Sequence, residues 1–209
     1  MAGIRPHLLI CDIQTAFTKA ISNYPSVVST ASKLLRASAT LNIPVYVTTQ
    51  NKARLGETIP PQGHEGLEGL DISRAKGIYD KTKFSMVLPE LMGDIMGPGY
   101  EQGKRVEEDQ RRSFAITGIE AHICVTQTAL DLLREGHRVY IIADGVSSSN
   151  PQEVPIALNR LRHAGAVVTT SESWIYEVMG DAKIAGFKEI ISLVKERQAK
   201  TRESLQSLL

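Results

Sequence analysis

Short apolar runs alternate with longer amphipathic segments along most of this chain, and this alternation limits the possible folds more than any other feature. Apolar runs without strict alternation are typical of strands buried on both faces of a parallel sheet. Segments with apolar residues at helical spacing suit the crossover helices that parallel strands require. The strand-like runs are His7–Ile13, Val45–Thr49, Ser113–Ile119, Val139–Ala143 and Ala166–Thr170, and the helix-like segments are Pro25–Asn42, Ile123–Glu135, Val154–Ala164 and Phe187–Arg197. We therefore predict an α/β protein, a three-layer α/β/α sandwich around a mainly parallel sheet of about six strands.

Two polar stretches interrupt this alternation, Asn51–Gly77 and Gly97–Arg112. Both are rich in Gly, Pro and charged residues and lack periodicity, which is typical of surface loops that shape a site. Neither is long enough to form a domain. A chain of 209 residues can bury a sufficient core without a disulfide or a metal. We therefore predict a single domain spanning residues 1–209.

The charge balance and the cysteine count argue against several classes of protein. Lys+Arg 24 against Asp+Glu 23 leaves a formal net charge of +1, whereas a nucleic-acid-binding domain is normally strongly basic. No apolar stretch approaches the ~20 residues that span a bilayer, and the first apolar run begins by Leu8, which leaves little room for a signal peptide. Two cysteines, Cys11 and Cys124, are too few for a disulfide framework. We therefore expect a soluble, intracellular and most simply cytoplasmic protein without a nucleic-acid or membrane partner.

Sequence signatures of nucleotide and metal sites are missing. The stretch Gly97–Lys104 is loosely like a phosphate-binding loop, but Pro98 stands where the first glycine belongs and Arg105 where Ser or Thr should follow the lysine. The first strand-like run leads into Ile13–Phe17 instead of a G-x-G-x-x-G sequence. The five histidines are scattered and form neither an i, i+4 pair nor H-E-x-x-H. We expect no cofactor and no bound metal.

Several polar residues lie at the ends of predicted strands. Asp12 ends the first strand, Gln50 the second, Lys81 follows a short third run, and Cys124 opens the helix after a later strand. Ligands of parallel sheets bind beyond these carboxyl ends, so the side chains should meet. Singly, Asp12 could cap a helix, Lys81 could be a solvated charge and Cys124 a core residue. Together they place a thiol near an ammonium and a helix N-terminus, which favours a reactive thiolate. Cys11 precedes Asp12 in the strand, so alternation predicts that its thiol points to the opposite face and stays inert.

Three stretches resemble a known family. They are L-L-I-C-D-I-Q-T-A-F from Leu8, K-T-K-F-S-M-V from Lys81, and G-I-E-A-H-I-C-V-T-Q-T-A-L-D from Gly118. In this order the D-x-Q-x-x-F, K-x-x-x-S and G-x-x-x-x-x-C elements are jointly specific. From Leu8 to Trp174 the chain resembles the isochorismatase-like cysteine hydrolase superfamily, and K-T-K-F-S-M-V and V-V-T-T-S-E are most similar to its isochorismatase domain-containing subgroup. The resemblance implies the isochorismatase-like hydrolase fold, a Rossmann-like sandwich.

The resemblance also implies an Asp–Lys–Cys catalytic triad. Asp12 matches the D of D-x-Q, and Cys124 matches the nucleophile. Lys81 matches the family lysine better than Lys83 does, because of its spacing from the serine of K-x-x-x-S. Such a triad would hydrolyse a small amide or a related C–N bond through a covalent cysteine intermediate, without a cofactor.

An oxyanion hole is the second feature that the resemblance implies. The family places a non-proline cis peptide just before the cysteine helix, which here falls at Ile119–Glu120. That bond directs the Glu120 N–H, beside the Cys124 N–H, toward the developing oxyanion. The candidate substrate contacts are Phe17 and Phe84 as pocket walls and Gln50 as a polar group.

Two departures from the family narrow the expected activity. Nicotinamidases carry a metal-binding D-x-H…H cluster after the second strand, where this chain has Gln50, Asn51 and Lys52, so neither nicotinamide nor a metal is expected. Isochorismatases that cleave a vinyl ether lack the nucleophilic cysteine that this chain retains as Cys124. The alternative function is a catalytically silent, oligomeric binding or scaffold protein on the same fold. Since family members assemble as dimers, tetramers or larger rings, we expect a homo-oligomer, a dimer or a tetramer.

Overall fold

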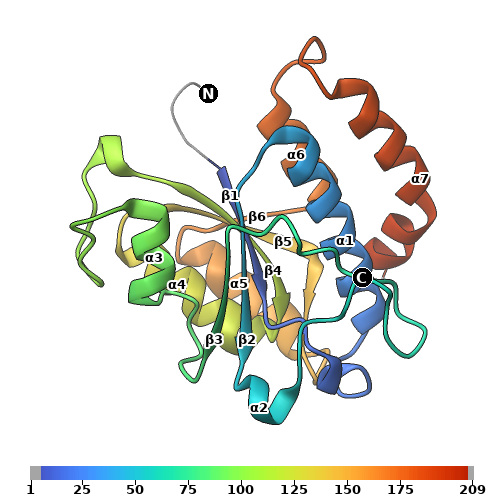
Figure 1. Cartoon of the computed structure of the whole chain (residues 1–209), viewed down its shortest axis with the longest axis horizontal. Coiled ribbons are helices and arrows are strands. Elements are labelled where there is room, and N and C mark those ends of the chain that lie inside the picture. The colour runs from blue at the N-terminus through green and yellow to red at the C-terminus, as the bar shows by residue number, and fades with distance from the viewer. Residues whose placement is uncertain (1–5, 207–209) are drawn as a thin grey trace.

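The computed structural model describes residues 6–206 and contains one six-stranded sheet within them (Figure 1). The strands are β1 (Pro6–Cys11), β2 (Val45–Gln50), β3 (Gly77–Lys81), β4 (Ser113–Ile119), β5 (Arg138–Ser147) and β6 (Val167–Thr169). Their order is β3-β2-β1-β4-β5-β6, and every neighbouring pair is parallel. From the centre of the sheet, successive strands lie outward from β1 toward one edge (β2, then β3) and outward from β4 toward the other (β5, then β6). A crevice for a ligand is therefore expected beyond the carboxyl ends of β1 and β4.

Helices cover both faces of the sheet, which confirms the predicted three-layer sandwich. One face packs against α1, α6 and α7, and the other packs against α3, α4 and α5 (Figure 1). The helices are α1 (Tyr24–Leu41), α2 (Lys52–Leu55), α3 (Pro89–Met96), α4 (Thr126–Arg134), α5 (Glu153–His163), α6 (Ser171–Met179) and α7 (Phe187–Gln206). None of the helices between residues 6 and 206 is long and apolar enough to cross a membrane.

Strand β1 is covered on both faces of the sheet, which explains why its sequence is apolar without alternation. Successive side chains of a strand point to opposite faces, so a strand covered on both faces needs apolar residues at every position. Leu8 and Ile10 pack with the helices α1, α6 and α7, whereas Leu9 and Cys11 pack with α3, α4 and α5. All four side chains are buried. The strand therefore links the two halves of the core and delivers its last residues to the carboxyl edge of the sheet.

Two segments differ from the sequence expectation. The predicted helix Ile123–Glu135 is divided into a π-helical turn, η3 (Ala121–Val125), followed by α4. The Val125 N–H donates to the Glu120 carbonyl at 3.2 Å, a wider turn than an α-helix makes. Helix α3 was not expected from the sequence, because its eight residues are too few for a clear helical period.

The polar stretch Gly97–Arg112 is an irregular loop, as expected, with one short 3₁₀ turn, η2 (Glu108–Gln110). A buried carboxylate, that of Glu135, holds it against the body of the protein. Glu135 accepts a hydrogen bond from the Gly103 N–H at 2.7 Å and one from the Tyr100 hydroxyl at 3.0 Å. Burial raises the pKa of this carboxyl group.

Candidate active site

Asp12 lies at the carboxyl edge of the sheet, directly after β1, with its carboxylate buried. Its backbone leaves the strand conformation, with a φ of 52°. Its Oδ2 accepts from Lys81 Nζ at 2.7 Å and from Cys11 Sγ at 3.6 Å, and its Oδ1 accepts from Thr48 Oγ1 at 2.8 Å. Three donors from three neighbouring strands thus fix the orientation of this carboxylate.

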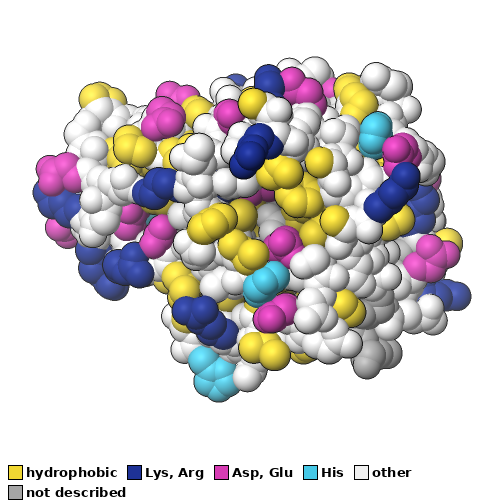
Figure 2. Space-filling view, turned by 90° about the horizontal axis from the view of Figure 1, so that it is seen from below, with side chains coloured by type: hydrophobic (Ala, Val, Ile, Leu, Met, Phe, Trp, Pro, Cys, Tyr) yellow, Lys and Arg dark blue, Asp and Glu magenta, His cyan; other side chains and the backbone are white. Residues whose placement is uncertain are grey.

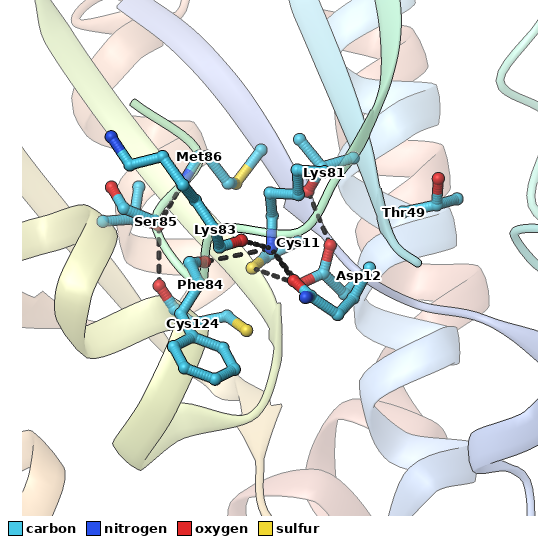
Figure 3. Close-up of polar contacts among 12 residues, drawn as sticks. Cys11, Asp12, Thr49, Lys81, Lys83, Phe84, Ser85, Met86 and Cys124 are labelled. Carbon is cyan, nitrogen blue, oxygen red and sulfur yellow. Dashed lines mark hydrogen bonds and ion pairs between the residues drawn. The ribbon is translucent and has the colours of Figure 1, made fainter. Parts of the chain in front are cut away.

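Lys81 is the last residue of β3, and its side chain is as deeply buried as that of Asp12. Besides Asp12, its ammonium donates to Gln50 Oε1 at 2.7 Å and to the carbonyl oxygens of Phe84 at 2.9 Å and Lys83 at 3.2 Å (Figure 3). Burial by itself lowers the pKa of Lys81, but its interactions with Cys11, Asp12 and Cys124, including the hydrogen bond to Asp12, outweigh burial and leave that pKa raised. The lysine is therefore a fixed positive charge beside the carboxylate.

Gln50 and Gln14 hold the Lys81 side chain in place through a series of hydrogen bonds. Gln50 accepts from Lys81 through Oε1 and donates through Nε2 to the Thr82 carbonyl at 2.9 Å, so both ends of its amide are engaged. Gln14 accepts from the Gln50 backbone N–H at 2.7 Å and donates to the Gly56 carbonyl at 2.7 Å. Sequence reasoning did not assign a role to Gln14, although the D-x-Q motif contains it. It also missed Thr48, which no motif marks.

Cys124 lies on η3, between β4 and α4, and is 6% exposed. Among residues 6–206, no hydrogen bond joins its thiol to Asp12 or to Lys81; its thiol lies near that of Cys11. The peptide bond Ile119–Glu120, just before η3, is cis. The predicted triad residues therefore converge on one edge of the sheet, with Asp12 and Lys81 in direct contact and Cys124 beside them (Figure 3).

Cys11 packs in the core, as predicted, but the prediction that its thiol points away from Asp12 is wrong. Its side chain lies on the sheet face that α4 covers, which is also the face of Cys124, and its thiol touches Asp12. Strand alternation failed as a guide because β1 ends at Cys11, and the left-handed backbone of Asp12 turns the next side chain out of the strand pattern.

The three predicted substrate contacts occupy different surroundings. Phe84 is 49% exposed, and its ring points in the direction of Cys124 in Figure 3. Phe17 ends a 3₁₀ turn, η1 (Thr15–Phe17), and packs against the core on the side of α1, α6 and α7. Gln50 contacts Lys81, as described above. Only Phe84 of the three is therefore both exposed and directed at the nucleophile candidate.

The carboxyl edge of the sheet is the face seen in Figure 2. Hydrophobic side chains gather there around a hollow, together with acidic side chains and a histidine. Within residues 6–206, no group of three His, Cys, Asp or Glu side chains lies close enough together to hold a metal ion. Asp12, Lys81 and Cys124 bring a carboxylate, an ammonium and a thiol to this edge.

Comparison with known proteins gives consistent matches over most of the chain. Residues 6–173 match the model of the isochorismatase domain. The secreted isochorismatase effector Isc1 of Phytophthora sojae is 37% identical over 194 residues, which is 91% of this chain and 86% of the effector. Isochorismatase domain-containing protein 2 of Homo sapiens is 38% identical over 189 residues, 90% of this chain and 82% of the human protein.

Solved structures with the same fold were also found. The MAR1 ribonuclease of Caenorhabditis elegans has a TM-score of 0.78 and 33% sequence identity, and the match covers 93% of this chain and 91% of that one. The YcaC gene product of Escherichia coli, described as an octameric hydrolase of unknown specificity, has a TM-score of 0.72 and 20% identity, with 98% and 95% coverage.

Proposed function

The chain belongs to the isochorismatase domain family, and from this premise we propose that it is a cysteine hydrolase that cleaves a small amide or a related C–N bond. The observation that carries the proposal is the buried contact between Asp12 and Lys81 beside a cysteine at a helix start. A buried ion pair is costly to maintain, so one at the carboxyl edge of a parallel sheet suggests a functional role.

In the proposed reaction, Cys124 is the nucleophile and Asp12 the base. Asp12 takes the thiol proton, and the Lys81 ammonium stabilises the resulting thiolate. The sulfur attacks the carbonyl carbon, and Asp12 then returns the proton to the departing nitrogen, which leaves a thioester on Cys124. Asp12 next takes a proton from water, whose oxygen attacks the thioester and breaks its carbon–sulfur bond. Asp12 then returns that proton to the Cys124 sulfur, which leaves the acid and the free thiol.

The backbone N–H groups of Glu120 and Cys124 are the proposed donors to the oxyanion in both steps. For substrate binding, we propose Phe84 as one wall, since it is exposed and directed at Cys124. The hydrophobic rim of the hollow in Figure 2 suits a substrate with an apolar substituent. Phe17 and Gln50 remain proposed contacts, with Gln50 also acting on Lys81.

The proposed enzyme uses no metal, because Gln50, Asn51 and Lys52 stand where nicotinamidases carry their metal ligands. We also propose a homo-oligomer, in line with the octameric state described for YcaC. The alternative, a silent binding or scaffold protein, keeps the same residues but predicts no turnover.

A panel of small amides tests the proposal. Wild type should hydrolyse at least one of them, Cys124→Ser should not, and Lys83→Ala should retain the wild-type rate because the Lys83 side chain is exposed. A limiting amount of iodoacetamide should label Cys124 well before the fully buried Cys11. An RNA substrate belongs in the panel because of the name of the nematode relative. Absence of turnover together with equal labelling of the two cysteines would favour the scaffold.

A further inference from the structure

Two thiols, not one, lie beside the Asp12 carboxylate. Cys11 Sγ is 3.6 Å from Asp12 Oδ2, and the Cys124 thiol lies near enough to raise the pKa of Cys11. Both side chains belong to the buried cluster between the sheet and helices α3, α4 and α5. In Figure 3 both sulfur atoms lie between Phe84 and Asp12. The hydrolysis proposed above uses only one of these thiols.

Close packing of β1 against β4 brings the two cysteines together. Cys11 pairs with Gly118 in the sheet, and the chain reaches Cys124 through a single turn after β4. Gly118 has a φ of 126°, and a Cβ atom there would lie 2.0 Å from the Cys11 carbonyl oxygen. Only glycine fits this position, so Gly118 permits the close approach of β1 and β4, the two strands that lead to Cys11 and Cys124.

We infer that Cys11 and Cys124 form a reversible intramolecular disulfide when the protein meets hydrogen peroxide. In the first step the Cys124 thiolate attacks a peroxide oxygen, so a sulfur–oxygen bond forms, the oxygen–oxygen bond breaks and hydroxide leaves. In the second step the Cys11 sulfur attacks the sulfur of the Cys124 sulfenic acid. A sulfur–sulfur bond forms, the sulfur–oxygen bond breaks, and the hydroxide takes the Cys11 proton to give water. The two thiols lose two electrons, and the peroxide gains them.

Exposure and hydrogen bonding assign the order of the two steps. Cys124 is 6% exposed and Cys11 is 0% exposed, so the peroxide reaches Cys124 first. Asp12 Oδ2 already accepts a hydrogen bond from Cys11, so it can pass the Cys11 proton to the leaving hydroxide. Burial above all raises the pKa of Cys11, which keeps this thiol protonated in the reduced protein and leaves Cys124 to react first. The two sulfur atoms must approach to about 2.05 Å to form the bond.

The consequence is protection of the nucleophile. A disulfide holds Cys124 in a form that a thiol reductant can restore, whereas oxidation to sulfinic or sulfonic acid is not reversed by such a reductant. The predicted loss of activity rests on the proposed hydrolase function. Formation of the disulfide does not depend on that function, because it is measured by the mass of the protein and not by its activity.

The test treats reduced, full-length protein with hydrogen peroxide, blocks free thiols with N-ethylmaleimide under denaturing conditions, and measures the intact mass. Wild type should lose two hydrogen atoms, take up no maleimide, and accept two maleimides after dithiothreitol. Digestion should give one peptide pair that links Cys11 to Cys124. Oxygen addition at Cys124 with Cys11 still open to maleimide would overturn the inference, as would disulfides found only between two chains.

Variants of Cys11 provide the matched control. In Cys11→Ser and Cys11→Ala, peroxide should add oxygen atoms to Cys124, and dithiothreitol should not restore its labelling. Using both replacements separates the loss of the thiol from a folding defect, which circular dichroism checks. If Cys124 in these variants recovers as fully as in wild type, Cys11 is not the resolving thiol and the inference fails.

Discussion

The Thr48 hydroxyl lies 2.8 Å from Asp12 Oδ1, while the next residue, Thr49, donates at 3.0 Å to Asp80 Oδ1. Neighbouring residues of β2 point to opposite faces of the sheet, so only Thr48 reaches the candidate base. Both threonines are buried. Asp12 therefore has a hydroxyl donor on one oxygen and an ammonium on the other, and Thr48 and Thr49 form a matched pair for mutation.

Thr48→Val should lower the rate at which iodoacetamide labels Cys124, and any hydrolysis rate with it. The substitution keeps the shape but removes a hydrogen bond to a charged group worth about 1.5–3 kcal/mol, so a decrease of about tenfold or more is expected. Thr49→Val should leave the labelling rate near that of wild type. Equal rates for wild type and Thr48→Val would show that Thr48 does not orient the carboxylate.

Lys81→Met should destabilise the protein by about 3–5 kcal/mol in urea unfolding, because it leaves the buried Asp12 carboxylate without its counter-ion. Adding Asp12→Asn should recover part of that loss, since the uncompensated charge is then removed. Lys83→Met is the control, because the Lys83 side chain is exposed and points away from Asp12 in Figure 3. A cost no larger than that of the control would contradict the buried-pair description.

His137 should lower the free energy of unfolding as the pH falls from 6.5 to 4. Burial first, and then the charge on Arg112, lower its pKa from 6.5 to about 4. Between these values the unfolded chain binds a proton that the folded chain does not, so acidification favours unfolding, by at most about 3 kcal/mol. In the variant His137→Leu, the fall of unfolding free energy from pH 6.5 to 4 should be shallower. The exposed His163, changed to Gln, should leave the slope of wild type unchanged.

Glu135→Leu should release the loop Gly97–Arg112 for proteolysis. The substitution removes the carboxylate that accepts hydrogen bonds from the Gly103 N–H and the Tyr100 hydroxyl. Trypsin should therefore cut after Lys104 faster than in wild type. Glu135→Gln, which keeps an acceptor oxygen, should lie between the two. The exposed Glu107 serves as the control when changed to Leu. If all four proteins are cut at the same rate, the carboxylate does not hold the loop.

Chelation should leave hydrolysis unchanged, and elemental analysis should find no stoichiometric metal in active protein. The expectation rests on Gln50, Asn51 and Lys52, which replace the metal ligands of nicotinamidases. One equivalent of zinc, iron or manganese whose removal abolishes activity would contradict it.

The sequence alone determined the layers and the order of the sheet's strands along the chain. Its alternation of apolar runs and amphipathic segments reflects burial on two faces, and burial is a property that hydrophobic pattern records directly. The sequence pattern did not predict the boundary between η3 and α4, and it did not predict the short helix α3. A single wide turn is decided by one backbone hydrogen bond, from Val125 to Glu120, and leaves no period in the sequence.

Asp12, Lys81 and Cys124 were predictable as neighbours because parallel strands and the helices that follow them bring their ends to one edge. Which side chains touch was decided by the tertiary structure. The contacts of Asp12 with Thr48 and with Lys81 join residues 36 and 69 positions apart, at ångström distances that depend on strand register and on packing between layers. The placement of Cys11 beside Cys124 depends in turn on a left-handed residue at Asp12 and a bare glycine at Gly118. Such contacts follow from how β1, β2, β3 and β4 pack together. The local sequence pattern does not encode the distances between side chains of different strands.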